Sequence, residues 1–198
     1  MKCQLDYIFM LPNDVERRKA LKSLPPDLPQ TYIRILERLD RDQSLPTQRL
    51  IRRVLVWLAF ESNRNTDWHA SLDLQSIATA VSIDVGCDAT RPSPPPPLPS
   101  DIASWCSSLV TVDEARNSIK FSHFSVKEFL VTLSDEVSSP VARKYLLQES
   151  RDKPYMAEVC LTHLTSHDLP PMIDWDDEAA LADFHRKFPF YCHAASVF

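Results

Sequence analysis

Glycine is almost absent from this chain of 198 residues: there is one, Gly86, against 16 prolines. Loops that cradle phosphate and elbows that hold a nucleophilic serine need several glycines at fixed spacing, because the backbone must turn tightly there and approach the ligand closely. None of the patterns G-x-x-x-x-G-K-[ST], G-x-G-x-x-G or G-x-S-x-G occurs in the sequence. The catalytic loops that depend on those patterns are therefore excluded from this chain.

Other features are equally scarce. No apolar run approaches the ~18 residues that cross a bilayer, and the first residues, MKCQLDYIFM, do not read as a signal peptide. The cysteines are odd in number, widely scattered and without a Cys-x-x-Cys pair, at Cys3, Cys87, Cys106, Cys160 and Cys192. This usage is typical of reduced thiols in an intracellular protein. We expect a cytoplasmic chain with no membrane partner.

Apolar residues recur at helical spacing along most of the chain, and 44% of the residues are apolar, as in ordinary globular proteins. The periodicity predicts helices at 14–22, 31–40, 45–60, 74–81, 101–108, 126–133, 140–149, 154–166 and 177–188. Residues 54–60 are apolar on all sides, which is typical of a buried central helix. We expect the core to include Trp57, Phe60, Trp105 and Phe129.

Three polar residues stand where helix N-caps are expected, because their side chains can accept hydrogen bonds from the first backbone N–H groups. Asp73 precedes 74–81 and Ser100 precedes 101–108. Ser125 precedes 126–133, and Glu128 three residues later completes the spacing of a capping box.

The apolar period changes to two at 109–113 and 118–122, which predicts two short strands joined by a turn at 114–117. Three helices, this hairpin and a further helix fill residues 45–133, in the order of a winged helix. We therefore predict a mainly α fold, a winged helix of three helices plus a two-stranded wing. Helical segments flank it at 1–44 and 134–198.

The most biased segment is the proline-rich loop at 84–100, which is predicted to be stiff and to have polyproline character. Within it, Arg91, Pro94 and Pro97 have the basic-x-x-Pro-x-x-Pro spacing of a ligand for an SH3-type domain. A stiff exposed loop without a partner accounts for the same composition, and both interpretations stay open.

A series of motifs, from about Leu5 to His193, resembles one family. The motifs occur in this order: RRKALKSLPPDLPQTYIRILERL, VLVWLAF, LDLQSIATAV, DIASWCSSLVTV, IKFSHFSVKEFL and YMAEVCLTHL. Together they resemble the helical and winged-helix segment that follows the NACHT nucleotide-binding core in fungal NLR-like (STAND) signalling NTPases. The same winged helix is also labelled after GPI inositol-deacylase, although it carries no deacylase chemistry. Ankyrin or similar repeats often follow it in that family.

The resemblance implies a non-catalytic, autoinhibitory module that works with a NACHT core in cis or in trans, and that has no cofactor of its own. In such proteins a histidine near the wing contacts bound ADP, and His123 is the residue that matches it. Neither the P-loop core nor ankyrin repeats are found in this sequence, so we expect a truncated chain. A histidine bonded only to nearby backbone explains the same position without any ligand.

Two other functions are compatible with parts of the sequence. A stand-alone winged helix could bind protein or DNA, but 101–108, in the recognition position, has no Lys or Arg and the net charge is -5. Nucleic acid is therefore not the expected partner. A more distant alternative is a hydrolase in which Ser122, Ser125 or Cys106 is paired with His123; it lacks a glycine-rich oxyanion loop.

A zinc site was the remaining candidate. Cys160, His163 and His167 lie at i, i+3 and i+7 of a predicted helix, a spacing that could place three ligands on one face. The same positions form the apolar stripe of that helix, and core packing is the favoured interpretation. We expect no metal.

Overall fold

In the computed structural model, the residues described are 28–60, 73–86, 95–113, 117–132, 139–166, 177–188, 190, 191 and 194. Over these residues the fold is mainly helical with a two-stranded antiparallel sheet, which confirms the predicted class. The helices are α3 (Leu28–Asp42), α4 (Leu45–Phe60), α5 (Leu74–Ser82), α6 (Pro99–Cys106), α7 (Phe124–Thr132), α8 (Pro140–Lys144), α9 (Glu149–Ser166) and α10 (Glu178–Lys187). A 3-10 turn, η1 (Ser107–Leu109), leads into strands β1 (Val110–Asp113) and β2 (Ser118–Phe121).

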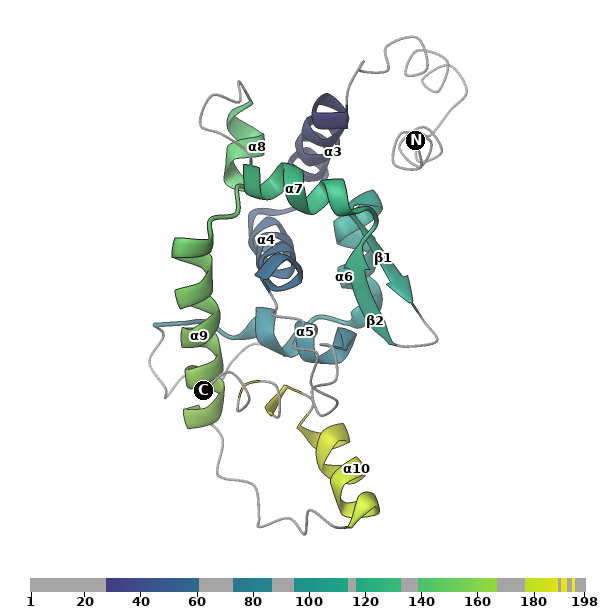
Figure 1. Ribbon diagram of the computed structural model, residues 1–198, viewed down its shortest axis with the longest axis vertical. Helices are drawn as coiled ribbons and strands as arrows, with labels where there is room; N and C mark the ends of the chain where they lie inside the picture. Colours follow the sequence, from purple (N-terminus) through teal and green to yellow (C-terminus); the bar gives the residue numbers. More distant parts are fainter. Residues whose placement is uncertain are drawn as a thin grey trace.

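Helix α4 runs through the middle of the molecule, with α9 on one side and α6 and the hairpin on the other (Figure 1). It contacts α3, α5, α6, α9 and β2. Its central residues are completely buried, namely Ile51, Val54, Leu55, Val56 and Trp57. The run of apolar residues therefore does predict the central helix. Phe60, Trp105 and Phe129, also expected in the core, are partly buried and pack against it.

Helix α3 joins α4 to the elements at one end of the fold, and it contacts α7 and α8 (Figure 1). Its buried stripe includes Tyr32, Ile35, Leu36 and Leu39, at the helical spacing that the sequence predicts. The ring of Tyr32 lies 5.2 Å from the ring of Phe129 on α7, measured between centroids. This contact places α7 against α3.

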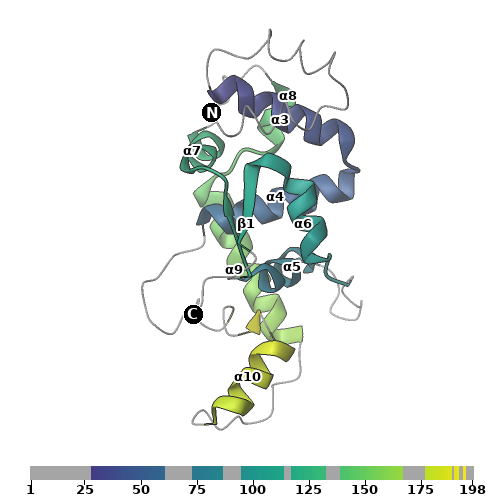
Figure 2. The ribbon, with the colours of Figure 1, turned by 90° about the vertical axis from the view of Figure 1, so that its right-hand side faces the viewer.

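The predicted hairpin forms, and its strands pair with Val110 opposite Phe121 and Asp113 opposite Ser118. Asn117 closes its turn with a positive φ of 47°, a conformation that asparagine tolerates better than most residues. The carbonyl of Asn117 accepts a hydrogen bond of 2.9 Å from the N–H of Leu74. The hairpin is thereby tied to the start of α5, and β1 lies beside α6 (Figure 2).

The predicted N-caps are partly wrong. Asp73 caps α5 as expected, because its carboxylate accepts a 2.6 Å hydrogen bond from the N–H of Ser76. Ser100, however, lies inside α6, which begins at Pro99 after a cap at Leu98. Proline has the backbone angle of a first helical residue and no N–H that needs a partner there, so the helix starts at Pro99, two residues earlier than predicted.

Two helices in 140–166 differ from their predicted bounds. Helix α8 ends at Lys144, and the chain then turns at Tyr145, which is buried together with Leu147. Helix α9 starts at Glu149 instead of at Pro154, which therefore lies inside it. A proline inside a helix removes one hydrogen bond and crowds the preceding turn, so the turn before Pro154 needs another source of stability.

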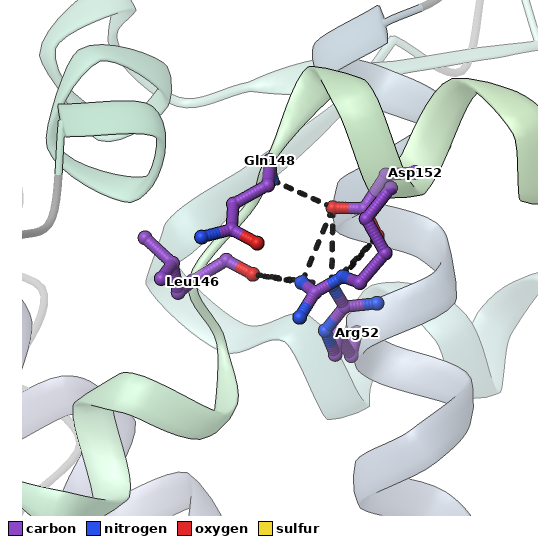
Figure 3. A network of polar contacts seen from close by, with 5 residues as sticks. Arg52, Leu146, Gln148 and Asp152 are labelled. Atoms are coloured by element: carbon purple, nitrogen blue, oxygen red, sulfur yellow. Dashed lines mark hydrogen bonds and ion pairs between the residues drawn. The ribbon is translucent and has the colours of Figure 1, made fainter. Parts of the chain in front are cut away.

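A polar network centred on Asp152 stabilises the turn before Pro154 (Figure 3). The Asp152 side chain is 2% exposed and its two oxygens accept hydrogen bonds from Arg52 on α4, at 2.8 and 3.0 Å. One of them also accepts a 2.8 Å bond from the backbone N–H of Gln148, the residue before the helix. The Arg52 and Arg151 side chains both donate to the carbonyl of Leu146. The network thus fixes the first turn of α9 against α4.

Within the described part of the chain, the helices are too short or too polar to cross a membrane. The helix predicted at 14–22 lies outside the described residues. The division into segments at 1–44, 45–133 and 134–198 stays a prediction.

Candidate functional site at the start of helix α7

His123 sits at the junction between β2 and α7, with its side chain exposed. Its Nδ1 accepts a hydrogen bond of 3.2 Å from the N–H of Ser125, and its carbonyl accepts one of 3.1 Å from the N–H of Val126. These are the bonds of an N-cap residue. The prediction that Ser125 caps this helix is therefore wrong: His123 does so, and Glu128 is two positions too far along for the expected capping box.

The imidazole is held by a chain of hydrogen bonds that reaches into the core. The Ser125 Oγ lies 2.6 Å from His123 Nδ1 and 2.7 Å from the hydroxyl of Tyr32. Nδ1 accepts from the Ser125 N–H and so carries no hydrogen of its own. The serine hydroxyl must then donate to Nδ1, and the Tyr32 hydroxyl must donate to the serine. This pattern assigns the hydrogen of the neutral ring to Nε2, the free edge.

The surface beside His123 carries apolar side chains and one basic side chain. Phe124 is 68% exposed, and its ring lies 4.4 Å from the His123 ring between centroids. Lys127 and Val131 are exposed further along the same helix, whereas Val126 is buried. The site therefore offers a hydrogen-bond donor at Nε2, an aromatic face and one positive charge, close to the positive end of the α7 dipole.

Of the three nucleophiles of the hydrolase alternative, the structure places one, Ser125, beside His123. Cys106 is fully buried, and burial raises the pKa of its thiol to about 12, so it carries no thiolate near neutral pH. Ser122 donates its hydroxyl hydrogen to the carbonyl of Ser108, at 2.7 Å. Ser125 is the one brought to His123, and its hydroxyl also bonds to Tyr32. The backbone N–H groups of Ser125 and Val126, which could otherwise face an oxyanion, donate to His123.

The candidate zinc ligands are placed as the core interpretation predicts. Cys160 and His163 are both buried in the core, and the His163 ring lies 5.1 Å from the ring of Phe190 between centroids. Burial raises the pKa of the Cys160 thiol to about 11. His167 lies outside the described residues. Among those described, no three His, Cys, Asp or Glu side chains gather as a metal site would require.

The structure describes only one of the three residues of the SH3-type motif. Arg91 and Pro94 lie outside the described residues, and Pro97 is half-buried just before α6. The SH3-type partner stays a prediction.

Two tyrosine-to-phenylalanine substitutions test the hydrogen bond between Tyr32 and Ser125. Tyr32 and Tyr145 are equally buried, but the Tyr145 hydroxyl has no hydrogen-bond partner among the described residues. Tyr32→Phe is expected to lower the free energy of unfolding by about 1 kcal/mol, because the Ser125 hydroxyl loses a buried donor. Tyr145→Phe is expected to leave it unchanged or slightly higher. Urea denaturation of both variants checks this, and equal losses would contradict the bond to Ser125.

No protein-family model, curated protein or solved structure matches this chain. What the chain does is therefore argued from its own residues, of which the exposed and firmly held His123 is the most distinctive.

Proposed function

We propose that this chain is a non-catalytic regulatory module that docks on the nucleotide-binding core of a NACHT-type signalling NTPase, in cis or in trans. Docking would hold that core in its resting, ADP-bound state. The observation that carries the proposal is the setting of His123. Its Nδ1 is occupied by Ser125, its Nε2–H is free to point outward, and an exposed Phe124 lies beside it.

The order of the elements supports this proposal, because it matches the order expected of a winged helix. Helices α4, α5 and α6, the β1–β2 hairpin and α7 follow one another in the order of that fold. In addition, Asp73 forms an isolated antiparallel bridge with Ser118 on β2. A short extended segment between the first two helices that pairs with the wing is what a winged helix requires. Because of this bridge, Asp73 lies beside β2 while its side chain caps α5.

The chemistry of His123 suits an anion. The first N–H groups of α7 already donate to His123 itself, so the imidazole replaces them as the donor at this helix end. A hydrogen bond from Nε2 to a charged phosphate oxygen contributes about 1.5–3 kcal/mol. A difference of that size changes a binding equilibrium by about ten- to a hundredfold. One contact could therefore decide whether the module favours the ADP-bound core.

DNA binding is less well supported. Helix α6 would occupy the recognition position, and its eight residues, PSDIASWC, include one acid and no base. Phosphate contacts need Lys or Arg, and base readout needs donors that this helix does not carry.

The experiment uses His123→Asn, because asparagine is a good N-cap and keeps the start of α7 while removing Nε2–H. The wild-type chain is titrated with the recombinant NACHT core of a fungal NLR-like NTPase, loaded with ADP or with a non-hydrolysable ATP analogue. We expect the wild type to bind the ADP-loaded core at least about tenfold more tightly. His123→Asn should bind both forms equally.

Lys187→Ala, which removes an exposed lysine on α10 at the opposite end of the molecule from α7 (Figure 1), is the matched control and should keep the ADP preference. An ADP preference that survives in His123→Asn would contradict the proposed role of His123. No binding to the core in either nucleotide state would contradict the proposed function itself.

A further inference from the structure

Leu98 is an unusual residue for its position. It is the N-cap of α6, since its carbonyl accepts hydrogen bonds from Asp101 and Ile102, at 2.9 and 3.2 Å. Leucine is among the poorest N-caps, because its side chain cannot accept a hydrogen bond from the helix. The side chain does not pack in the core either: it is 64% exposed. Leu98 therefore stabilises the fold neither as an N-cap nor as a core residue. A residue that breaks the local rules in this way is typical of a functional site.

The residues before Leu98 have a backbone set by proline. Residues 95–99, which we call the proline arm, read Pro-Pro-Pro-Leu-Pro. Each proline ring fixes φ, and every residue that precedes a proline is pushed towards the extended region. Positions 95–98 accordingly show no helix or strand. The arm therefore has the preset shape of a polyproline II segment, with three residues per turn.

One edge of the arm faces the fold and the others face solvent. Pro95, Pro96 and Leu98 are exposed, whereas Pro97 between them is half-buried. With three residues per turn, Pro95 and Leu98 share an edge and Pro96 lies on the next one. The exposed surface is thus two prolines and a leucine, and the nearest charged residue after it is Asp101.

Unlike the carbonyl of Leu98, the first three carbonyls of the arm accept no backbone hydrogen bond from the described residues. Among the described residues, no backbone hydrogen bond ends on the carbonyls of Pro95, Pro96 or Pro97. Proline carbonyls that lack an internal partner accept hydrogen bonds from Tyr hydroxyl or Trp indole groups, which line the grooves of proline-recognising domains.

We propose that the proline arm is a docking ligand for a small domain of the WW type, whose groove is walled by aromatic rings. Pro95 and Pro96 would lie between the rings, and Leu98 would fill the adjoining apolar contact. Because the arm is already extended and its end is fixed to α6, little conformational entropy is lost on binding. This register uses Leu98, whereas the SH3-type motif in the same loop depends on Arg91 and Pro94.

The test uses the whole chain and a substitution that should not harm the fold. Leu98→Asp replaces a poor N-cap by a good one, so its melting temperature is expected to be unchanged or raised. The full chain is titrated by calorimetry with a recombinant WW domain that takes Pro-Pro-Leu-Pro peptides. The wild type should bind in a saturable manner, and Leu98→Asp should bind about tenfold more weakly or worse, because a buried leucine contact is lost.

Leu45→Asp is the matched control. Leu45 is 65% exposed and also stands at the start of a helix, but it is far from the proline arm in the sequence. This variant should bind the WW domain as the wild type does. Two results would overturn the proposal: no saturable binding of the WW domain by the wild type, or equal binding by Leu98→Asp. Binding of an SH3 domain that is lost in Arg91→Ala but kept in Leu98→Asp would also overturn it.

Discussion

An Asp152→Ala chain is expected to lose about 2–3 kcal/mol of unfolding free energy relative to the wild type. Removing one partner of a buried ion pair costs about 3–5 kcal/mol, and the lower figure applies because Arg52 keeps some contact with solvent. Alanine is the better helix former, so helix propensity alone would stabilise the variant. The loss would therefore measure the network that Asp152 forms with Arg52 and the N–H of Gln148.

The control is Asp183→Ala, because Asp183 forms exposed ion pairs with Arg186 and Lys187 within its own helix. Exposed pairs of this kind contribute little to stability, because water and salt screen their charges. Hydrogen exchange locates the effect: in Asp152→Ala the amides of residues 151–153 should exchange faster, while those after Pro154 stay protected. If both variants lose the same free energy, the network is not what holds the start of α9.

The ion pair between Arg52 and Asp152 also makes the stability of the chain depend on pH. Burial by itself raises the pKa of the Asp152 carboxyl, but hydrogen bonds from Arg151, Arg52 and Gln148 outweigh it, so the pKa lies below its ordinary value of 3.8. A depressed pKa stabilises the folded chain fully above the ordinary value, and this contribution disappears as the pH falls through the folded pKa. The difference between wild type and Asp152→Ala should therefore be constant near neutral pH and shrink in acid.

The start of α9 shows where sequence reasoning fails. Taken locally, Pro154 favours a helix that begins with it, because proline fits a first turn and disrupts an interior. The actual start depends on Arg52, 100 residues earlier in the chain. Apolar periodicity cannot detect a contact between two charged residues so far apart, so the helix was predicted but its first turn was not.

The caps show the same limit at closer range. Asp73 could be predicted because its side chain acts on a residue three positions away. The role of His123 could not, because it depends partly on Tyr32, which the sequence presents only as one member of the apolar stripe of α3. Apolar periodicity was reliable for α3 and α4 and for the hairpin, where burial alone decides the structure. It carries no information on the polar bonds that set the candidate site.

The central position of α4 leads to the largest effect expected for a single core residue. Trp57→Ala should lower the free energy of unfolding by about 3–5 kcal/mol, the usual loss when a fully buried aromatic side chain is removed. The Trp57 ring meets the ring of Phe190 edge-on, with 5.4 Å between centroids, so the substitution also loosens the segment near the C-terminal end of the described chain. Far-ultraviolet circular dichroism in urea measures the loss without relying on tryptophan fluorescence.

Trp105→Ala on α6 is the matched control, because its ring is only partly buried and packs at the edge of the same core. It is expected to lose less than half as much free energy as Trp57→Ala, in proportion to the smaller apolar area that it removes from water.

A double variant with Phe190→Ala should show a coupling energy of about 0.5–1.5 kcal/mol with Trp57, as edge-on aromatic pairs do. Equal losses from the two tryptophans would mean that α4 is not the centre of the fold. Zero coupling would mean that Phe190 does not rest on Trp57. Because the His163 ring on α9 also lies against the Phe190 ring, that second result would separate the packing of α9 from the packing of α4.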